Sequence, residues 1–113
     1  MQYRQLGRSG LKVSALCLGT MNFGSRTSPE ESFTILSSAV EAGINFIDTA
    51  DQYGGDAGVG TTETILGQWL AQDPNRRHKA VIATKVHEPM SDAVNDRGLS
   101  ARHIQKALSL IHI

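Results

Sequence analysis

Three residue types that can take part in proton transfer follow two predicted strands of this chain. Residues 44–48 read as a buried strand that ends on a carboxylate, Asp48, and Tyr53 follows in a glycine-rich loop. A second strand, 80–86, carries Lys85 near its end. Active sites gather at the carboxyl ends of strands in parallel sheets, so we expect these groups to meet at one rim. An acid, a phenol and an amine there suit proton transfer.

The distance between neighbouring strands decides whether these groups can meet. The ends of adjacent parallel strands lie about 5 Å apart, within reach of an ion pair. Each residue alone also has a structural interpretation: Asp48 as a helix cap, Tyr53 as a rim aromatic and Lys85 as a solvated strand end. As a matched set, the three favour a functional interpretation.

The elements that must position these groups begin with a hairpin, in which residues 3–6 and 11–14 flank a turn with glycine at both ends. Residues 15–19 are apolar without alternation, which predicts a short, fully buried strand. We expect Cys17 within it to be part of the core. A polar loop over 22–27 follows.

Two helices are marked by their ends. Ser28, Pro29 and Glu31 form a capping box with proline at the first helical position, and Gly43 stands where a left-handed C-cap belongs. The second helix begins near Thr61, carries a glutamate in its first turn to favour the helix dipole, and has an apolar stripe. That glutamate is Glu63, and the stripe is Ile65, Leu66, Trp69 and Leu70.

The remaining segments are a basic turn, a loop and a third helix. Residues 73–79 predict a solvated turn at the end of the sheet opposite the strand ends that carry Asp48 and Lys85. A long polar loop over 87–99 leads to Ser100, the expected cap of a third helix.

The order of hairpin, then alternating strands and helices, indicates a parallel sheet covered by helices. A doubly wound sheet and a (β/α)₈ barrel both satisfy this order. The pattern G-x-G-x-x-G does not follow any predicted strand, which counts against a Rossmann dinucleotide site. The glycines of residues 54–60 are better explained by a flexible loop that needs positive φ angles.

Composition excludes several classes of function. Eleven basic and eleven acidic residues cancel, so the charge gives no case for nucleic acid or an anionic membrane as partner. One cysteine fits a reducing compartment, and neither a membrane span nor a secretory signal is evident, so we expect a cytoplasmic protein. The histidines lack metal-ligand spacing, so no metal is expected.

Several segments together resemble the amino-terminal part of the aldo-keto reductases. The segments are YRQLGRSGLKVS (3–14), LGTMNFG (18–24), AGINFIDTADQYG (42–54), ETILG (63–67) and VIATKV (81–86). The resemblance covers residues 3–107 in order and spacing. It implies a (β/α)₈ TIM barrel closed below by the opening hairpin, with NADPH bound across the mouth. The segment 1–107 is therefore expected to be an incomplete barrel: the hairpin plus roughly three βα units.

The resemblance also implies roles for the site residues. Tyr53 matches the family's general acid, with Lys85 and Asp48 as its supporting pair. A phenol donates a proton poorly at neutral pH unless a nearby cation favours the phenolate, and a carboxylate keeps such a cation charged. Thr20 and Met21 match the segment that lines the nicotinamide, and Asp48 approaches the nicotinamide ribose. A capping threonine and a core methionine are their structural alternatives.

The chain also departs from the family pattern. The family's catalytic histidine lies on a later strand, whereas His112 comes only three residues after Ser109 and is still within the third helix by its pattern. Residues 108–113 resemble a translated sequencing adaptor and are expected to be a non-native tail. Three of eight βα units leave strand edges unpaired, so we expect the isolated chain to be aggregated or partly unfolded, and inactive.

The leading hypothesis is an oxidoreductase that transfers a hydride between NADPH and a small carbonyl or alcohol substrate. Two alternatives stay open at this point. One is a cofactor-binding auxiliary subunit of the potassium-channel type, because such subunits keep the same three residues. The other is a barrel aldolase in which Lys85 forms a Schiff base, which would require a neutral amine.

Overall fold

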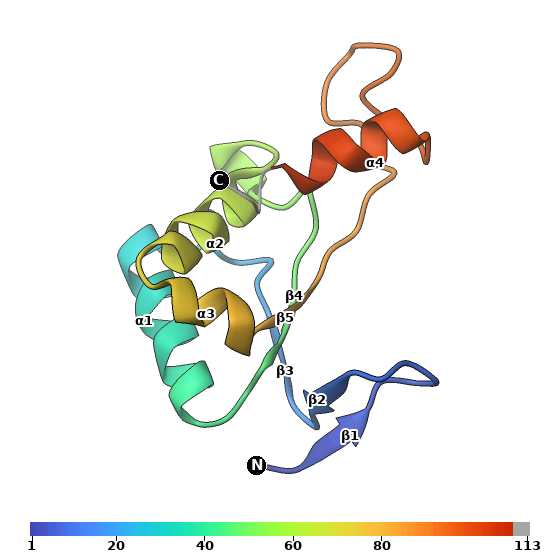
Figure 1. The fold of residues 1–113 in the computed structure, drawn as a ribbon. Helices are drawn as coiled ribbons and strands as arrows, with labels where there is room; N and C mark the ends of the chain where they lie inside the picture. The colour runs from blue at the N-terminus through green and yellow to red at the C-terminus, as the bar shows by residue number, and fades with distance from the viewer. Residues whose placement is uncertain (110–113) are drawn as a thin grey trace.

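The computed structural model describes residues 1–109, and its chain begins with the predicted hairpin. Strand β1 (Tyr3–Gln5) pairs antiparallel with β2 (Lys12–Ser14). The hairpin is tied to the first residues before the central strand: the backbone N–H of Ser14 donates to Asn45 Oδ1 at 2.7 Å, and the Tyr3 hydroxyl donates to the Gly43 carbonyl at 2.8 Å. These contacts anchor the hairpin below the sheet (Figure 1).

A three-stranded parallel sheet carries the predicted site. Strands β3 (Cys17–Gly19), β4 (Phe46–Asp48) and β5 (Val81–Ala83) lie in the order β3-β4-β5. Gly19 is in register with Asp48, and Asp48 with Ala83. The carboxyl ends of all three strands therefore lie at one edge, as the alternating pattern predicts.

Helices connect the strands. Helix α1 (Pro29–Glu41) has the predicted capping box at Ser28 and Glu31, and Gly43 follows it with φ +90°. Helix α2 (Thr61–Ala71) begins where predicted, after the short 3₁₀ helix η1 (Gly55–Ala57). Helix α4 (Ala101–Leu108) begins at its Ser100 cap.

The core lies between the sheet and these helices. Helices α1, α2 and α3 lie on the same side of the strands, while α4 lies near the end of the sheet away from the hairpin (Figure 1). Ile47 in the middle of β4 is fully buried and belongs to one apolar cluster with the predicted stripe of α2. The indole N–H of Trp69 donates to Ser37 Oγ at 3.0 Å and so joins α2 to α1.

The prediction of a fully buried strand at 15–19 is wrong. Strand β3 covers only Cys17–Gly19, and of its residues only Leu18 is half-buried. Cys17 is exposed, so the prediction that it lies in the core is also wrong. Among the described residues, β3 pairs with β4 alone and is therefore an edge strand, whose other edge has no neighbouring strand.

The predicted turn at 73–79 contains a short helix, α3 (Pro74–Lys79). Asp73 caps it by accepting the backbone N–H of Asn75 at 2.9 Å, and Pro74 takes the first helical position. Arg76 is not simply solvated: its guanidinium lies 4.7 Å from the centroid of the Trp69 ring and donates to the Trp69 carbonyl.

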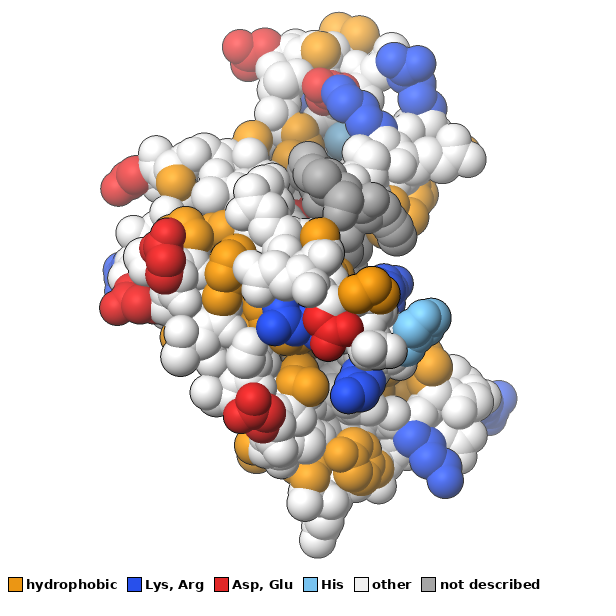
Figure 2. Space-filling view, turned by 60° about the vertical axis from the view of Figure 1, so that its left-hand side comes forward, with side chains coloured by type: hydrophobic (Ala, Val, Ile, Leu, Met, Phe, Trp, Pro, Cys, Tyr) orange, Lys and Arg blue, Asp and Glu red, His pale blue; other side chains and the backbone are white. Residues whose placement is uncertain are grey.

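The described residues agree with part of a (β/α)₈ barrel, although they do not themselves form a closed barrel. Acidic, basic and apolar side chains are interspersed on the face shown in Figure 2, in keeping with the balanced composition. Within residues 1–109, no helix combines the length and apolar character needed to cross a bilayer. Of the expected tail 108–113, residues 110–113, with His112, lie outside the described part.

Candidate active site

The structure brings Asp48 and Lys85 together at the predicted rim. The Lys85 ammonium lies 2.9 Å from Asp48 Oδ1 and 2.8 Å from Asp48 Oδ2. The Lys85 and Asp48 side chains are 52% and 39% exposed, so the ion pair faces open space above the sheet. Asp48 is in register with Ala83, and Lys85 follows the end of β5 by two residues, so the two groups meet at the rim, as the sequence predicts.

Tyr53 reaches the same ammonium. Its hydroxyl oxygen lies 3.2 Å from Lys85 Nζ, which also donates to the Thr49 carbonyl at 2.9 Å. Partial burial lowers the pKa of Lys85, but the hydrogen bonds to Asp48 and Tyr53 outweigh it and raise the pKa above its ordinary value. Lys85 is therefore held as a cation between a carboxylate and a phenol.

Backbone hydrogen bonds beyond the regular strands fix this geometry. The N–H of Thr49 donates to the Ala83 carbonyl at 2.8 Å, and the N–H of Asp51 donates to the Lys85 carbonyl at 3.1 Å. The Tyr53 carbonyl accepts the N–H of Thr62 in the first turn of α2 at 3.2 Å. The loop that carries Tyr53 is thus attached both to the end of β5 and to α2.

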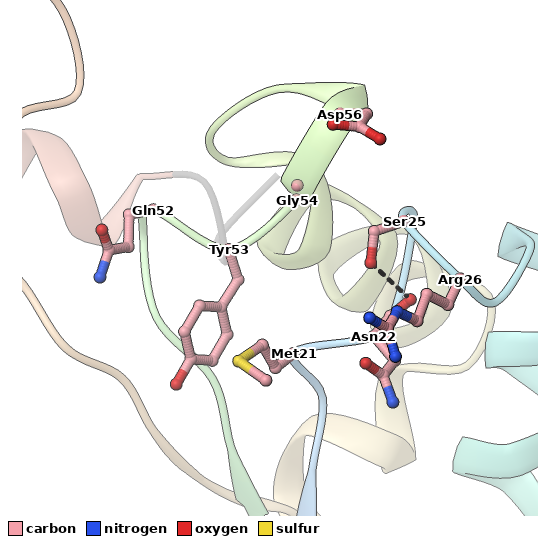
Figure 3. A pocket seen from close by; sticks show the side chains of 9 residues that line it. Met21, Asn22, Ser25, Arg26, Gln52, Tyr53, Gly54 and Asp56 are labelled. Atoms are coloured by element: carbon pink, nitrogen blue, oxygen red, sulfur yellow. Dashed lines mark hydrogen bonds between the residues drawn. The ribbon is translucent and has the colours of Figure 1, made fainter.

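Thr20 and Met21 differ in how they meet the rim. Thr20 is fully buried, and its hydroxyl donates to the Asp48 carbonyl at 2.9 Å, so it ties the end of β3 to β4. Met21 is 62% exposed and is therefore not a core methionine. Its thioether lies beside the Tyr53 ring (Figure 3).

An open cavity of about 550 Å³ lies beside Tyr53, between the loops that follow β3 and β4. Figure 3 shows Met21 and the Tyr53 ring close together, with Asn22 and Arg26 farther along the cavity. The sequence predicts only a polar loop at 22–27, so Asn22 and Arg26 were not predicted as lining residues. The residues that line the cavity are Met21, Asn22, Ser25, Arg26, Gln52, Tyr53, Gly54, Gly55 and Asp56.

A group of buried titratable residues on the other side of the strand ends was also missed. Glu63, expected only to favour a helix dipole, is fully buried and accepts a hydrogen bond from the Thr84 hydroxyl. Asp51 and His103 are 2% and 1% exposed. The spacing of Glu63 with Leu66 and Leu70 would have placed it on the apolar face of α2.

Burial shifts the pKa values of the Glu63 and Asp51 carboxyls. It raises the pKa of Glu63; the hydrogen bond from Thr84 opposes this, and the nearby charge of Asp51 adds to it. Burial likewise raises the pKa of Asp51; the Gln52 backbone N–H and His103 oppose the shift, whereas Glu88 adds to it. Among the described residues, His, Cys, Asp and Glu do not form a group of three that could hold a metal ion.

The described residues thus form a parallel β/α sheet that carries a lysine, an acid and a tyrosine at one rim. The family model described as "Aldo/keto reductase family" matches residues 15–110. The chain belongs to the aldo/keto reductase family, a family of oxidoreductases whose members generally use NAD(P)H.

Three relatives illustrate the similarity. The chain is 52% identical to "Uncharacterized oxidoreductase YrpG" of Bacillus subtilis, with 96% of this chain and 34% of that protein aligned. It is 42% identical to "6-dehydroglucose reductase" of Novosphingobium aromaticivorans, over 74% of this chain and 28% of that protein. It is 38% identical to "Probable voltage-gated potassium channel subunit beta" of rice, Oryza sativa subsp. japonica, over 96% and 32%.

The chain spans about a third of the length of these relatives. A chain of the relatives' length that contains residues 1–107 is called the full-length protein.

Replacing Gly54 with alanine is expected to lower kcat about tenfold or more by displacing Tyr53. Gly54 has φ +156°, and a Cβ there would collide with the Gly58 carbonyl oxygen. Gly58→Ala is the matched control, because Gly58 also has a positive φ but has open space around the added carbon. Steady-state kinetics should show the larger loss for Gly54→Ala; equal losses would mean that the collision has no effect.

Replacing Glu63 with glutamine is expected to stabilise the protein progressively as the pH rises. A carboxyl whose pKa is raised in the folded state lowers the stability of the protein as the pH rises from the ordinary pKa of 4.5 to the raised value. Below both pKa values it has no such effect. The thermal midpoint of Glu63→Gln should therefore gain on that of the wild type as the pH rises above about 4.5. Glu41→Gln is the matched control, because it makes the same substitution at an exposed position.

Proposed function

We propose that this chain forms part of an NADPH-dependent reductase that interconverts carbonyl compounds and alcohols, with Tyr53 as the proton donor. The observation that carries the proposal is the position of Lys85 Nζ, within hydrogen-bond distance of both Asp48 carboxylate oxygens and the Tyr53 hydroxyl. Family membership supports the reaction class.

The groups present fit the nicotinamide end of the cofactor. The exposed Met21 and the Asp48–Lys85 pair border open space at the rim, where a flat ring can approach the Tyr53 hydroxyl. Thr20 would contribute by holding the ends of β3 and β4 together, since its hydroxyl is already bonded. When bound, NADPH supplies the hydride.

The residues of this chain would handle the proton. A carbonyl oxygen that gains negative charge needs a donor, and the Tyr53 hydroxyl would give its proton to that oxygen. The Lys85 ammonium would then stabilise the phenolate that remains. Asp48 keeps the ammonium charged, and the Thr49 carbonyl fixes its direction.

The complete protein would contain the rest of the barrel. Residues 1–107 would contribute the hairpin and the first three βα units, while 108–113 would be foreign to the protein. We expect a soluble cytoplasmic enzyme that acts on a small carbonyl compound and needs neither a metal nor nucleic acid.

Turnover tests this function directly. The full-length protein should oxidise NADPH when supplied with an aromatic aldehyde such as 4-nitrobenzaldehyde, and the alcohol should accumulate in equal amount. Consumption of NADPH without alcohol, or no consumption across a panel of aldehydes and ketones, would contradict the proposal.

A second candidate is an auxiliary subunit that binds the cofactor with little turnover. The name of the 38% identical rice relative favours it. The observation that would select it is tight NADPH binding without turnover, together with co-purification with a membrane channel. The aldolase alternative is disfavoured because Schiff-base formation needs a neutral amine. The ion pair with Asp48 keeps the Lys85 amine protonated.

A further inference from the structure

Behind the rim lies a second polar group, made by the neighbours of the site residues. Asp48 and Lys85 face the open side of the strand ends. Thr49 and Asp51 are buried, and the Thr84 hydroxyl donates into the protein to Glu63 of α2. Side chains alternate along an extended chain, so residues of the same two strand ends face the open side and the protein interior in turn.

The buried side contains polar atoms that are costly to bury. Within residues 1–109, five such atoms have no hydrogen-bond partner: Thr49 Oγ1, Asp51 Oδ2, Glu63 Oε2 and both ring nitrogens of His103. Each lost hydrogen bond in the interior opposes folding, so a packing role alone does not account for this group. His103 is also the one residue of α4 that is buried.

Glu63, Asp51 and Thr49 are each coupled to Lys85 by a short step. Glu63 holds Thr84, which is covalently joined to Lys85. The backbone of Asp51 donates to the Lys85 carbonyl, and Thr49 supplies the carbonyl that accepts from Lys85 Nζ. His103 and Glu88 act electrostatically on Asp51, and Asp51 acts on Glu63. A shift of Glu63 or Asp51 would therefore reach the ammonium.

We propose that Glu63, Thr84 and Asp51 form a positioning cluster that fixes Lys85 beneath the Tyr53 hydroxyl by holding the end of β5 and the loop 49–53 from behind. Its catalytic consequence rests on the proposed function, because it concerns the geometry of that proton donor. Glu63 is the central member, because it accepts a hydrogen bond from Thr84, the residue next to Lys85 in the chain.

Three variants of the full-length protein separate positioning from stability. Glu63→Ala removes the acceptor for Thr84, Glu63→Gln restores an acceptor, and Leu66→Ala removes a fully buried apolar side chain from the same face of α2. We expect kcat with 4-nitrobenzaldehyde to fall roughly 10- to 100-fold in Glu63→Ala, to recover in Glu63→Gln, and to be unaffected in folded Leu66→Ala. KM for NADPH should stay within about twofold throughout.

Thr84→Val provides the same test if Glu63→Ala fails to fold, because it removes only the donor hydroxyl, and Thr84→Ser should restore activity. Unchanged kcat in both Glu63→Ala and Thr84→Val, or an equal loss in Leu66→Ala, would overturn the proposal.

A second measurement does not depend on turnover. The pKa of the Lys85 amine, followed by NMR after reductive methylation with ¹³C-formaldehyde, should move in Glu63→Ala or Thr84→Val and return with Glu63→Gln or Thr84→Ser. An inactive wild type that shows this movement would reject the proposed reductase but support the cluster. An active wild type whose variants show no movement of the Lys85 pKa would support the proposed reductase but reject the cluster.

Discussion

Replacing Tyr53 with phenylalanine in the full-length protein is expected to lower kcat by about 10²- to 10⁴-fold. The substitution removes one oxygen atom and leaves the aromatic ring that borders the cavity. Because the hydroxyl lies 3.2 Å from Lys85 Nζ, its loss removes the proton donor while the Asp48–Lys85 pair stays in place. Binding of NADPH, measured by protein fluorescence quenching, should change by less than about threefold.

Tyr3→Phe is the matched control for this prediction. Its hydroxyl donates to the Gly43 carbonyl in the hairpin region, away from the rim. The control should keep its activity, with at most a small loss of stability. Unchanged turnover in Tyr53→Phe would remove the proton-donor role, whereas an equal loss in both variants would point to unfolding.

The sequence predicted the rim because two local rules were sufficient. Each strand was recognisable from its apolar run, and parallel register then placed the end of β4 beside the end of β5. The hairpin and the caps of α1, α2 and α4 depend on near neighbours in the chain, such as Ser28 with Glu31, so they too were predictable.

Features that depend on what covers a residue were not predictable in the same way. Cys17 lies in an apolar run but on an edge strand, and a composition-based prediction assigned it to the core. Asp73 and Pro74 were interpreted as turn residues, although Asp73 caps helix α3 and Pro74 takes its first position. Asp51, Glu63 and His103 are far apart in the chain, so their joint burial becomes visible only once α2 and α4 are placed.

Replacing Lys85 with methionine removes the cation of the site and leaves the phenol of Tyr53 in place. Methionine keeps much of the length of the lysine side chain but carries no charge, so Asp48 and the Thr49 carbonyl lose their shared donor. We expect kcat to fall by about 10²- to 10⁴-fold, because the phenolate left by proton donation would no longer have a cation beside it. Stopped-flow measurement of hydride transfer would place the loss in the chemical step.

Lys79→Met makes the same change at an exposed position at the end of α3 and should leave the rate unaltered. Asp48→Asn adds a stricter comparison, since it keeps the shape of the pair but removes the charge that holds the ammonium. If Lys85 acts only through Tyr53, combining Lys85→Met with Tyr53→Phe should cost little more than Tyr53→Phe alone. Additive losses would mean that Lys85 assists the reaction by a route that does not pass through the phenol.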